Sequence, residues 1–294
     1  MPRHAPLPAP FDRGAFRVGI ALAAGLTTGR MRGGDLARPF HGVRAIASDG
    51  IVDAIGAYGA RMPAEQFFSH WTAAGIHRLP TPRSTHGLHV TAIAPARTPR
   101  VKGVTGHSIS RAEVCVIGGL RVSSPVQTWV DMSTELSHRD LVTMGDALVR
   151  RKQPIATLDQ LSAAVLANSG RRGAANLSSA FARVRARTDS VQETYLRLAI
   201  VDFGLPEPEV NIKILDARGR FIAWGDLGYP QFRVLAEYDG EQHRTDEAQF
   251  FRDVDRLDDI AEERWRVVRF NKSHVSRQRL LRLQRALISA GWRP

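Results

Sequence analysis

The chain has 294 residues, of which 43% are hydrophobic and 24% charged, a composition typical of a globular protein long enough for two or three domains. No apolar run approaches the roughly 18 residues that a membrane-spanning helix requires, so we expect no membrane partner. Arg17 interrupts the apolar-rich stretch 15–26, which therefore predicts a short core helix and not a signal peptide.

The single cysteine, Cys115, lies in the apolar run Val114–Ile117, which predicts a buried strand. A buried thiol usually behaves as a small hydrophobic group, so Cys115 is interpreted as an inert core residue. One cysteine cannot form an intramolecular disulfide, and secreted proteins rarely leave a thiol alone. We therefore expect a cytoplasmic protein.

Positive charge is concentrated in the first two thirds of the chain. The net charge is +12, and residues 1–187 hold 24 Lys and Arg against 11 Asp and Glu, whereas residues 188–294 hold 17 against 18. A basic region of this size favours a polyanionic partner such as DNA, because phosphate contacts release counterions. The alternative is an arginine-rich surface with no nucleic-acid partner.

The N-terminal segment predicts three short helices followed by an extended stretch. The expected helices are 16–24, 28–32 and a short piece from Asp35 to Pro39, and the extended stretch is 40–45. This order suits a small winged helix-turn-helix region over residues 1–48. Other small helical units share the same pattern.

The middle of the chain alternates between helical and extended patterns. The expected helices are 51–60, 63–74, 126–136 and 140–150, and the expected strands are 89–93, 101–107 and 114–117. This alternation predicts an α/β domain over residues 49–187.

The C-terminal segment has the clearest order of elements. It predicts a helix at 190–203, strands at 210–215, 221–227 and 232–238, a helix at 246–264, a strand at 266–270 and a helix at 276–290. The order is α-β-β-β-α-β-α, and we place the domain boundary near residue 187.

Three acidic residues stand near the ends of two of these strands. Asp226 precedes the turn Gly228–Pro230, and Glu237 and Asp239 share one face at the end of the next strand. Simple hairpin pairing is expected to hold Asp226 away from Glu237 unless the strands bend or stagger. If the carboxylates do converge, oxygen-only ligands suit Mg²⁺ or Mn²⁺, which activate water and stabilise phosphoryl transfer.

These residues also carry a resemblance. Asp226, the run EYDGEQH at 237–243, RDVDRL at 252–257 and WRVVR at 265–269 resemble nuclease-like domains related to the very-short-patch repair endonuclease, in the PD-(D/E)XK fold group. The resemblance covers residues 188–290 and implies a restriction-endonuclease-like domain over residues 188–294.

The resemblance implies a role for each site residue. Asp226 and Glu237 would bind the metal, Glu193 would assist from the helix, and His243 would lie by the scissile phosphate. The group has Lys at the position of Asp239, which here could only complete the metal shell or accept a proton. This departure puts catalytic competence in doubt, unless His243 or Gln242 takes over the task of the lysine.

Each residue also has a structural alternative. Glu193 completes a capping-box pattern that begins at Ser190, Asp226 and Asp239 suit turns, and His243 could be an ordinary surface or core histidine.

Three charged residues of the expected helix 246–264 are also candidates. They could pair with one another on the helix surface, or support the active site. These residues are Arg252, Asp253 and Arg256.

The front of the chain resembles abortive-infection antitoxin proteins. The segments that carry this resemblance are 23–27, 41–44, 69–74 and 124–131. It implies a winged helix followed by an α/β domain, with phosphate or base contacts from arginines. These arginines are Arg30, Arg32, Arg38 and Arg44, and their alternative is plain surface charge.

The pair Ser69 and His70 within segment 69–74 could suggest a nucleophile and its base. The sequence places no third partner beside them, so we favour helix capping and packing.

The sequence therefore predicts a DNA-binding protein with a metal-dependent endonuclease-type domain, acting in repair or defence. The alternative is a non-enzymatic, antitoxin-like regulator whose nuclease fold is inactive. RNA is a less favoured substrate. A homodimer or a toxin-like partner stays open.

Overall fold

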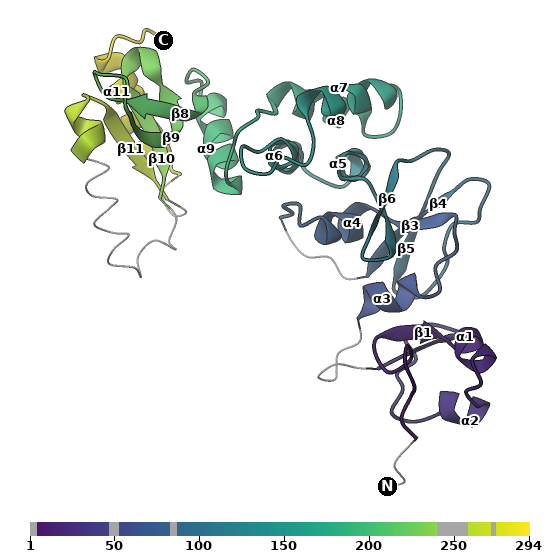
Figure 1. The fold of residues 1–294 in the computed structure, drawn as a ribbon. Coiled ribbons are helices and arrows are strands. Elements are labelled where there is room, and N and C mark those ends of the chain that lie inside the picture. Colours follow the sequence, from purple (N-terminus) through teal and green to yellow (C-terminus); the bar gives the residue numbers. More distant parts are fainter. Residues whose placement is uncertain (1–4, 47–52, 83–86, 240–257, 272–274) are drawn as a thin grey trace. The chain divides into compact units, whose positions relative to one another are not determined.

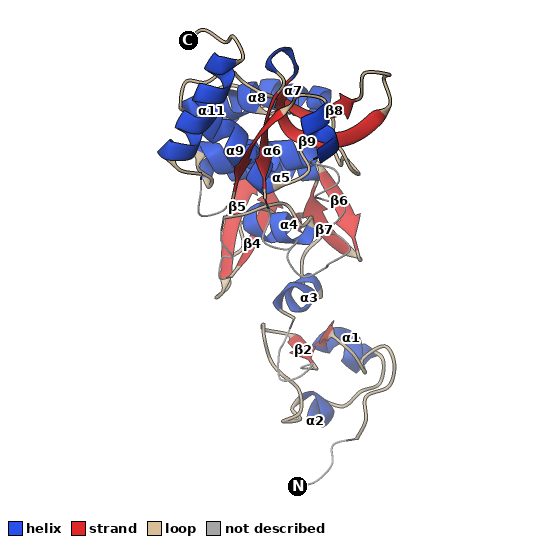
Figure 2. Ribbon diagram, turned by 90° about the vertical axis from the view of Figure 1, so that its left-hand side faces the viewer, coloured by secondary structure: helices blue, strands red, loops and turns tan. Residues whose placement is uncertain are grey.

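The computed structural model describes residues 5–46, 53–82, 87–239, 258–271 and 275–294, and these form two compact units (Figure 1). The first unit contains Met1–Arg78 and Arg83–Asp131, and the second contains Leu79–Pro82 and Met132–Pro294. Both units combine helices with β-sheets, which confirms the α/β class (Figure 2). The boundary expected near residue 187 lies inside the second unit.

The N-terminal part of the first unit pairs two short strands around two short helices. These elements are β1 (Ala15–Arg17), α1 (Val18–Ala23), α2 (Thr28–Met31) and β2 (Val43–Ala45). Strands β1 and β2 are antiparallel, and the Thr27 side chain caps α2 by accepting a hydrogen bond from the Arg30 N–H at 3.1 Å. Phe11, Phe16 and Met31 belong to the small core that holds this part together.

The prediction of a third short helix from Asp35 to Pro39 is wrong. The segment instead forms a turn, and Ala37 then bridges to Ala45 beside β2. The buried Leu36 joins the core in this extended arrangement, so tertiary packing overrides the helical pattern.

The rest of the first unit is a five-stranded mixed sheet with helices. Its elements are α3 (Ala54–Gly59), β3 (Gln66–Phe68), α4 (His70–Ile76), β4 (Leu88–Ile93), β5 (Val104–Ile109), β6 (Val114–Ile117), β7 (Leu120–Ser123) and α5 (Pro125–Asp131). The strand order is β5-β4-β3-β7-β6. Three strands expected from the sequence are thus confirmed as β4, β5 and β6.

The helix expected at 63–74 is wrong in its first half. Gln66, Phe67 and Phe68 form the central strand β3, and all three side chains are buried. A short apolar run does not reveal by its period whether it is a strand or a buried helix, and here the place at the centre of the sheet decides for the strand.

The second unit begins with a group of helices. These are the 3-10 turn η1 (Met132–Thr134), α6 (His138–Leu148), α7 (Leu158–Ala167), α8 (Ala174–Arg183) and α9 (Val191–Asp202). The guanidinium of Arg197 on α9, which is 0% exposed, binds the carboxylate of Asp146 on α6 at 2.8 Å. This buried ion pair joins the two sides of the boundary expected near residue 187.

A four-stranded sheet follows α9. Its elements are β8 (Glu209–Leu215), β9 (Phe221–Tyr229), the 3-10 turn η2 (Pro230–Phe232), β10 (Val234–Tyr238), β11 (Arg266–Phe270) and the helix α11 (Arg277–Ser289). The strand order is β11-β10-β9-β8, with β10 and β11 parallel and the other pairs antiparallel. Side chains of α9 and α11 pack into one core with β9, β10 and β11.

The sequence-based order of elements is confirmed here for α9, β8, β9, β10, β11 and α11. Of the helix expected at 246–264, residues 258–262 are helical and 246–257 lie outside the described residues. None of the described helices has both the length and the apolar character needed to cross a membrane.

Candidate functional site

The pairing of β9 with β10 brings two of the expected acidic residues together. The pairing of these strands ends with Leu227 opposite Ala236, and Asp226 and Glu237 are the next residues of the two strands. The backbone N–H of Tyr238 donates to Asp226 Oδ2 at 2.9 Å, which holds the carboxylate against β10. The expectation that hairpin pairing would separate these two acids is therefore wrong.

The reason lies in the turn. Strand β9 continues through Gly228 and Tyr229, and the chain reverses over Pro230–Phe232. Asp226 therefore lies within a strand, and its interpretation as a turn residue is wrong. A Cβ at Gly228 would meet the side chain of Ile212 on β8, so a larger residue there would force the Ile212 side chain to move.

Glu193 lies in the first turn of α9 and is 7% exposed. Its Oε2 accepts hydrogen bonds from the Asp189 N–H at 2.9 Å and from Asn211 Nδ2 at 3.1 Å. The Ser190 side chain caps α9 by accepting from the Glu193 N–H, which confirms one half of the capping pattern. The Glu193 carboxylate, however, reaches Asp189 and Asn211 and so faces the sheet.

Asn211 is a site residue that the sequence analysis missed. It lies on β8 between the paired positions Val210–Leu227 and Ile212–Gly225, and hence opposite Asp226. Its side chain is buried and its φ is 48°, a left-handed conformation that Asn tolerates better than most residues. The sequence feature that could have identified it is a polar Asn among the alternating apolar residues of β8.

The local electrostatics mark Glu193 as a perturbed carboxyl group. Burial, followed by repulsion from Asp226, raises the pKa of Glu193 from 4.5 to about 7. Buried carboxyl groups that repel each other are the arrangement in which a cation is favourable, because the cation offsets both the desolvation and the repulsion.

Glu237 and Asp239 differ in their surroundings. Glu237 is 6% exposed within the apolar strand β10, whereas Asp239 is exposed one residue beyond the strand. The Asp239 N–H donates to the Phe270 carbonyl at 2.6 Å and so continues the parallel pairing with β11. The backbone at Asp239 is thus fixed by the sheet, while its carboxylate lies in solvent.

The acidic residues do not form a closed cluster. Within the described part of the chain, one group of three or more His, Cys, Asp or Glu side chains has ligand atoms that all lie within 4.8 Å of one another, and it consists of His70, His89 and His107. The carboxylate oxygens of Glu193, Asp226 and Glu237 therefore do not all lie within 4.8 Å of one another.

The remaining expected residues of this site lie outside the described residues. They are His243, Arg252, Asp253 and Arg256.

A basic pocket lies beside the acidic residues. Three cations surround the Trp224 ring on β9: Arg151 at 4.6 Å, Lys213 at 5.5 Å and Arg187 at 5.7 Å from its centroid. Arg151, Arg187 and Trp224 line a pocket of about 680 Å³. The Arg187 carbonyl accepts from Asn211 Nδ2 at 2.8 Å, so Asn211 contacts both this pocket and Glu193.

The four N-terminal arginines differ in availability. Arg30 binds both oxygens of Asp35, at 2.9 and 2.6 Å, and Arg44 donates to the Met31 carbonyl at 2.6 Å and to that of Val43. These two side chains hold the N-terminal part together.

Arg32 and Arg38 are exposed, and Arg38 Nη2 donates to the Arg32 carbonyl at 3.1 Å. They are the two of the four whose side chains face solvent.

Glutamine in place of Glu193 is expected to raise the free energy of unfolding above about pH 7.5, in EDTA, by about 1–3 kcal/mol. Because the folded-state pKa lies above 4.5, the folded protein retains a proton that the unfolded chain releases, and wild-type stability falls as pH rises from 4.5 to about 7. Glutamine carries no charge, and its carbonyl oxygen can accept the same two hydrogen bonds.

Urea unfolding at pH 4.5 and pH 8.5 measures the difference in the free energy of unfolding between Glu193→Gln and the wild type. This difference should be large at pH 8.5 and small at pH 4.5. A variant that is no more stable than the wild type at pH 8.5 would contradict the assignment of a buried, strained carboxylate to Glu193.

Comparisons with known proteins found similar proteins from Mycobacterium tuberculosis. No family model matches the chain. Two Mycobacterium tuberculosis proteins, uncharacterized protein MT2308 and uncharacterized protein Rv2248, are each 25% identical over 250 residues, which cover 85% of this chain and 90% of each relative. The crystal structure of the RV2827C protein from the same organism has a TM-score of 0.39 and 18% identity, over 57% of this chain and 72% of that one.

Proposed function

We propose that residues 188–294 form a restriction-endonuclease-like domain of the PD-(D/E)XK group, which hydrolyses phosphodiester bonds in DNA with Mg²⁺ or Mn²⁺. The observation that carries this proposal is the hydrogen bond from the Tyr238 N–H to Asp226, which holds that carboxylate one residue from Glu237 and beside the buried Glu193. The parallel pairing of β10 with β11, packed against α9 and α11, supports it.

The donor set fits such an ion. Carboxylate and amide oxygens are hard ligands that suit Mg²⁺ or Mn²⁺ better than softer metals. Asp226 and Glu237 would hold the ion, and the exposed Asp239 would complete the shell or accept a proton from water. Glu193 would assist from α9, held by Asn211. The bound ion would supply charge stabilisation and an activated water.

The basic pocket would hold the nucleic acid next to these acids. Arg187 and Lys213 would offer cations to phosphates, while Arg151 is held by its ion pair with Asp189, and all three cations lie over the Trp224 ring. The link through Asn211 places this pocket next to Glu193, so a strand held there would pass close to the acidic residues.

The N-terminal part would add a second DNA contact of the winged-helix type. Its short helices α1 and α2 lie in the chain between the antiparallel strands β1 and β2, and the exposed Arg32 follows α2 directly. Exposed guanidinium groups of this kind bind anions such as the phosphates of DNA.

Alanine at both Arg32 and Arg38 is expected to weaken DNA binding by about 10-fold at low salt and to lower the salt dependence by about two phosphate contacts. Fluorescence anisotropy measures both quantities when a labelled duplex is titrated at salt concentrations from about 50 to about 200 mM. The control is alanine at Arg13, an exposed arginine of the same part. Equal losses in control and variant would argue for general charge and against a contact through Arg32 and Arg38.

A cleavage assay tests the nuclease proposal. The full chain is incubated with supercoiled, linear and single-stranded DNA and with RNA, in Mg²⁺, Mn²⁺ or EDTA. Cleavage that needs the metal and is lost in Glu237→Ala supports the proposal. Glu209→Gln is the matched control, because Glu209 is an exposed carboxylate of the same sheet. RNA as the sole substrate would change the assigned substrate and keep the site.

A second candidate function is a non-enzymatic, antitoxin-like DNA-binding regulator. The observation that favours it is Asp239, which stands where the nuclease group has a lysine that orients water. Tight, sequence-specific binding without cleavage in any metal would support the regulator and overturn the enzyme. A toxin-like partner or a homodimer would then be sought by mass measurement of the purified complex.

A further inference from the structure

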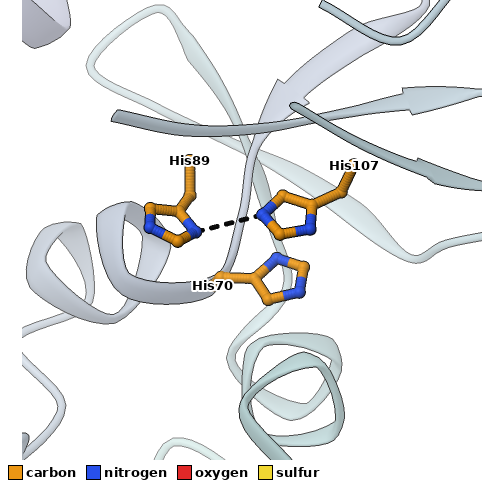
Figure 3. Close-up of side chains that lie close together, drawn as sticks. All are labelled: His70, His89 and His107. Atoms are coloured by element: carbon orange, nitrogen blue, oxygen red, sulfur yellow. Dashed lines mark hydrogen bonds between the residues drawn. The ribbon is translucent and has the colours of Figure 1, made fainter. Parts of the chain in front are cut away.

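The first unit carries a histidine cluster that the proposed nuclease function does not use. His89 on β4 and His107 on β5 lie on one face of two adjacent parallel strands. The register pairs His107 with Thr91, and Thr91 shares a face with His89 because the two are two residues apart on β4. His70 begins α4 and stacks on His107, with ring centroids 3.7 Å apart (Figure 3). His89 Nδ1 and His107 Nε2 are 3.0 Å apart, and the ligand atoms of all three residues lie within 4.8 Å of one another.

The backbone places His70 in this cluster at a cost. Its φ is 48°, in the left-handed region that non-glycine residues seldom adopt. Such residues persist where the surrounding structure fixes them, and they concentrate at functional sites. Ser69, which precedes it, is fully buried and makes no side-chain cap to α4. The hydroxyl of Ser69 instead contacts His70 Nδ1 at 3.0 Å.

A hydroxyl pair orients the His70 ring. Thr91 Oγ1 donates to Ser69 Oγ at 2.7 Å, and Ser69 Oγ lies 3.0 Å from His70 Nδ1. In the tautomer whose Nδ1–H donates to Ser69, the lone pair is on Nε2. Metal-binding histidines commonly have their second ring nitrogen held in this way, which fixes tautomer and ring plane. This contact also accounts for the pair Ser69 and His70 without a nucleophilic role.

We propose that His70, His89 and His107 bind a Zn²⁺-class transition-metal ion through one nitrogen each. Three imidazoles form a ligand set for Zn²⁺, Co²⁺, Ni²⁺ or Cu²⁺, and not for Mg²⁺, which prefers oxygen. Three protein ligands leave the fourth tetrahedral position for a water or a small anionic ligand. The cluster belongs to the first unit, whereas the acidic residues of the proposed nuclease site belong to the second.

Binding requires only side-chain adjustments. Two nitrogens on one tetrahedral Zn²⁺ lie about 3.3 Å apart when each bond is about 2.0–2.1 Å, close to the separation of His89 Nδ1 and His107 Nε2. When the metal binds, the hydrogen shared by His89 Nδ1 and His107 Nε2 moves to the other nitrogen of the ring that carries it. The His70 ring turns out of its stack, because a ligand lone pair lies in the ring plane.

Titration of the EDTA-treated full chain with Co²⁺ and Zn²⁺ tests the site. The wild type is expected to bind Co²⁺ at this site with the intense visible absorption of tetrahedral nitrogen-ligated cobalt, which oxygen-ligated cobalt at the acidic residues does not give, and Zn²⁺ should displace it. His107→Ala and His70→Ala should bind at least about 100-fold more weakly, whereas the exposed-histidine control His41→Ala should bind as the wild type does. Asp226→Asn should also retain the signal, because its carboxylate belongs to the second unit.

X-ray absorption of the Zn²⁺-loaded wild type gives an answer that does not depend on the folding of a variant. Three imidazole nitrogens at about 2.0 Å are expected in the first coordination shell. Oxygen-only ligation, absence of a tetrahedral cobalt spectrum in the wild type, or full binding by both folded histidine variants would overturn the proposal.

Discussion

Asparagine in place of Asp226 is expected to lower the rate of Mg²⁺-dependent DNA cleavage by at least about 100-fold, with little change in stability. The amide oxygen of Asn can still accept the hydrogen bond from the Tyr238 N–H, so the link from β9 to β10 is kept. What is lost is the negative charge of Asp226 next to Glu237. A hard divalent cation loses much of its binding energy with that charge, and the reaction depends on the cation.

Single-turnover cleavage of a labelled duplex at saturating metal measures the effect, and thermal unfolding confirms the fold. Glu209→Gln should cleave at the wild-type rate. If Asp226→Asn cleaved as fast as that control, the acidic residues around Glu193 would have no part in the chemistry. A gradual recovery at high Mn²⁺ would indicate weakened metal binding and would agree with the proposal.

Alanine in place of Asp146 is expected to lower the free energy of unfolding of the second unit by about 3–5 kcal/mol. Asp146 Oδ2 binds Arg197 at 2.8 Å and accepts from Thr194 at 2.8 Å, and both partners of the ion pair are 1% exposed. Removing the carboxylate leaves a buried guanidinium with only Glu207 as its acidic partner, at 2.8 Å. Loss of one of two acidic partners is strongly destabilising for a buried cation, because the partly exposed Glu207 compensates the charge only in part.

Denaturant unfolding followed by hydrogen exchange of α6 and α9 measures this loss in the full chain. The matched control is Asp202→Ala, which breaks the exposed Arg183–Asp202 pair and should cost less than about 1 kcal/mol. Equal losses in the two variants would show that burial of the Arg197 pair has no special weight.

The sequence predicts the elements of residues 188–290 better than their pairing. Short apolar runs separated by turn residues such as Asp216–Gly219 identify the strands, and the Ser190 cap identifies the start of α9. The register depends on which residues form the turn between β9 and β10. Because the chain reverses over Pro230–Phe232 and not at Gly228, β9 and β10 pair as far as Leu227 and Ala236, the residues next to Asp226 and Glu237.

Contacts between distant segments account for the other differences. Asn211 meets Glu193 only because β8 packs beside the start of α9, and no local pattern of the sequence shows this. The three clustered histidines stand on α4, β4 and β5, and only the strand order brings them together. Arg30 was expected to face DNA, but its partner Asp35 becomes evident only once the chain turns back after α2.

The buried Arg197 has a consequence for where the chain can be cut into fragments that fold. Its guanidinium binds Asp146 on α6, the Arg183 carbonyl at the end of α8, and Glu207. A fragment that begins at residue 188 keeps Glu207 but loses Asp146, Arg183 and the helices that bury this cation. We therefore expect residues 132–294 to give a more stable fragment than residues 188–294.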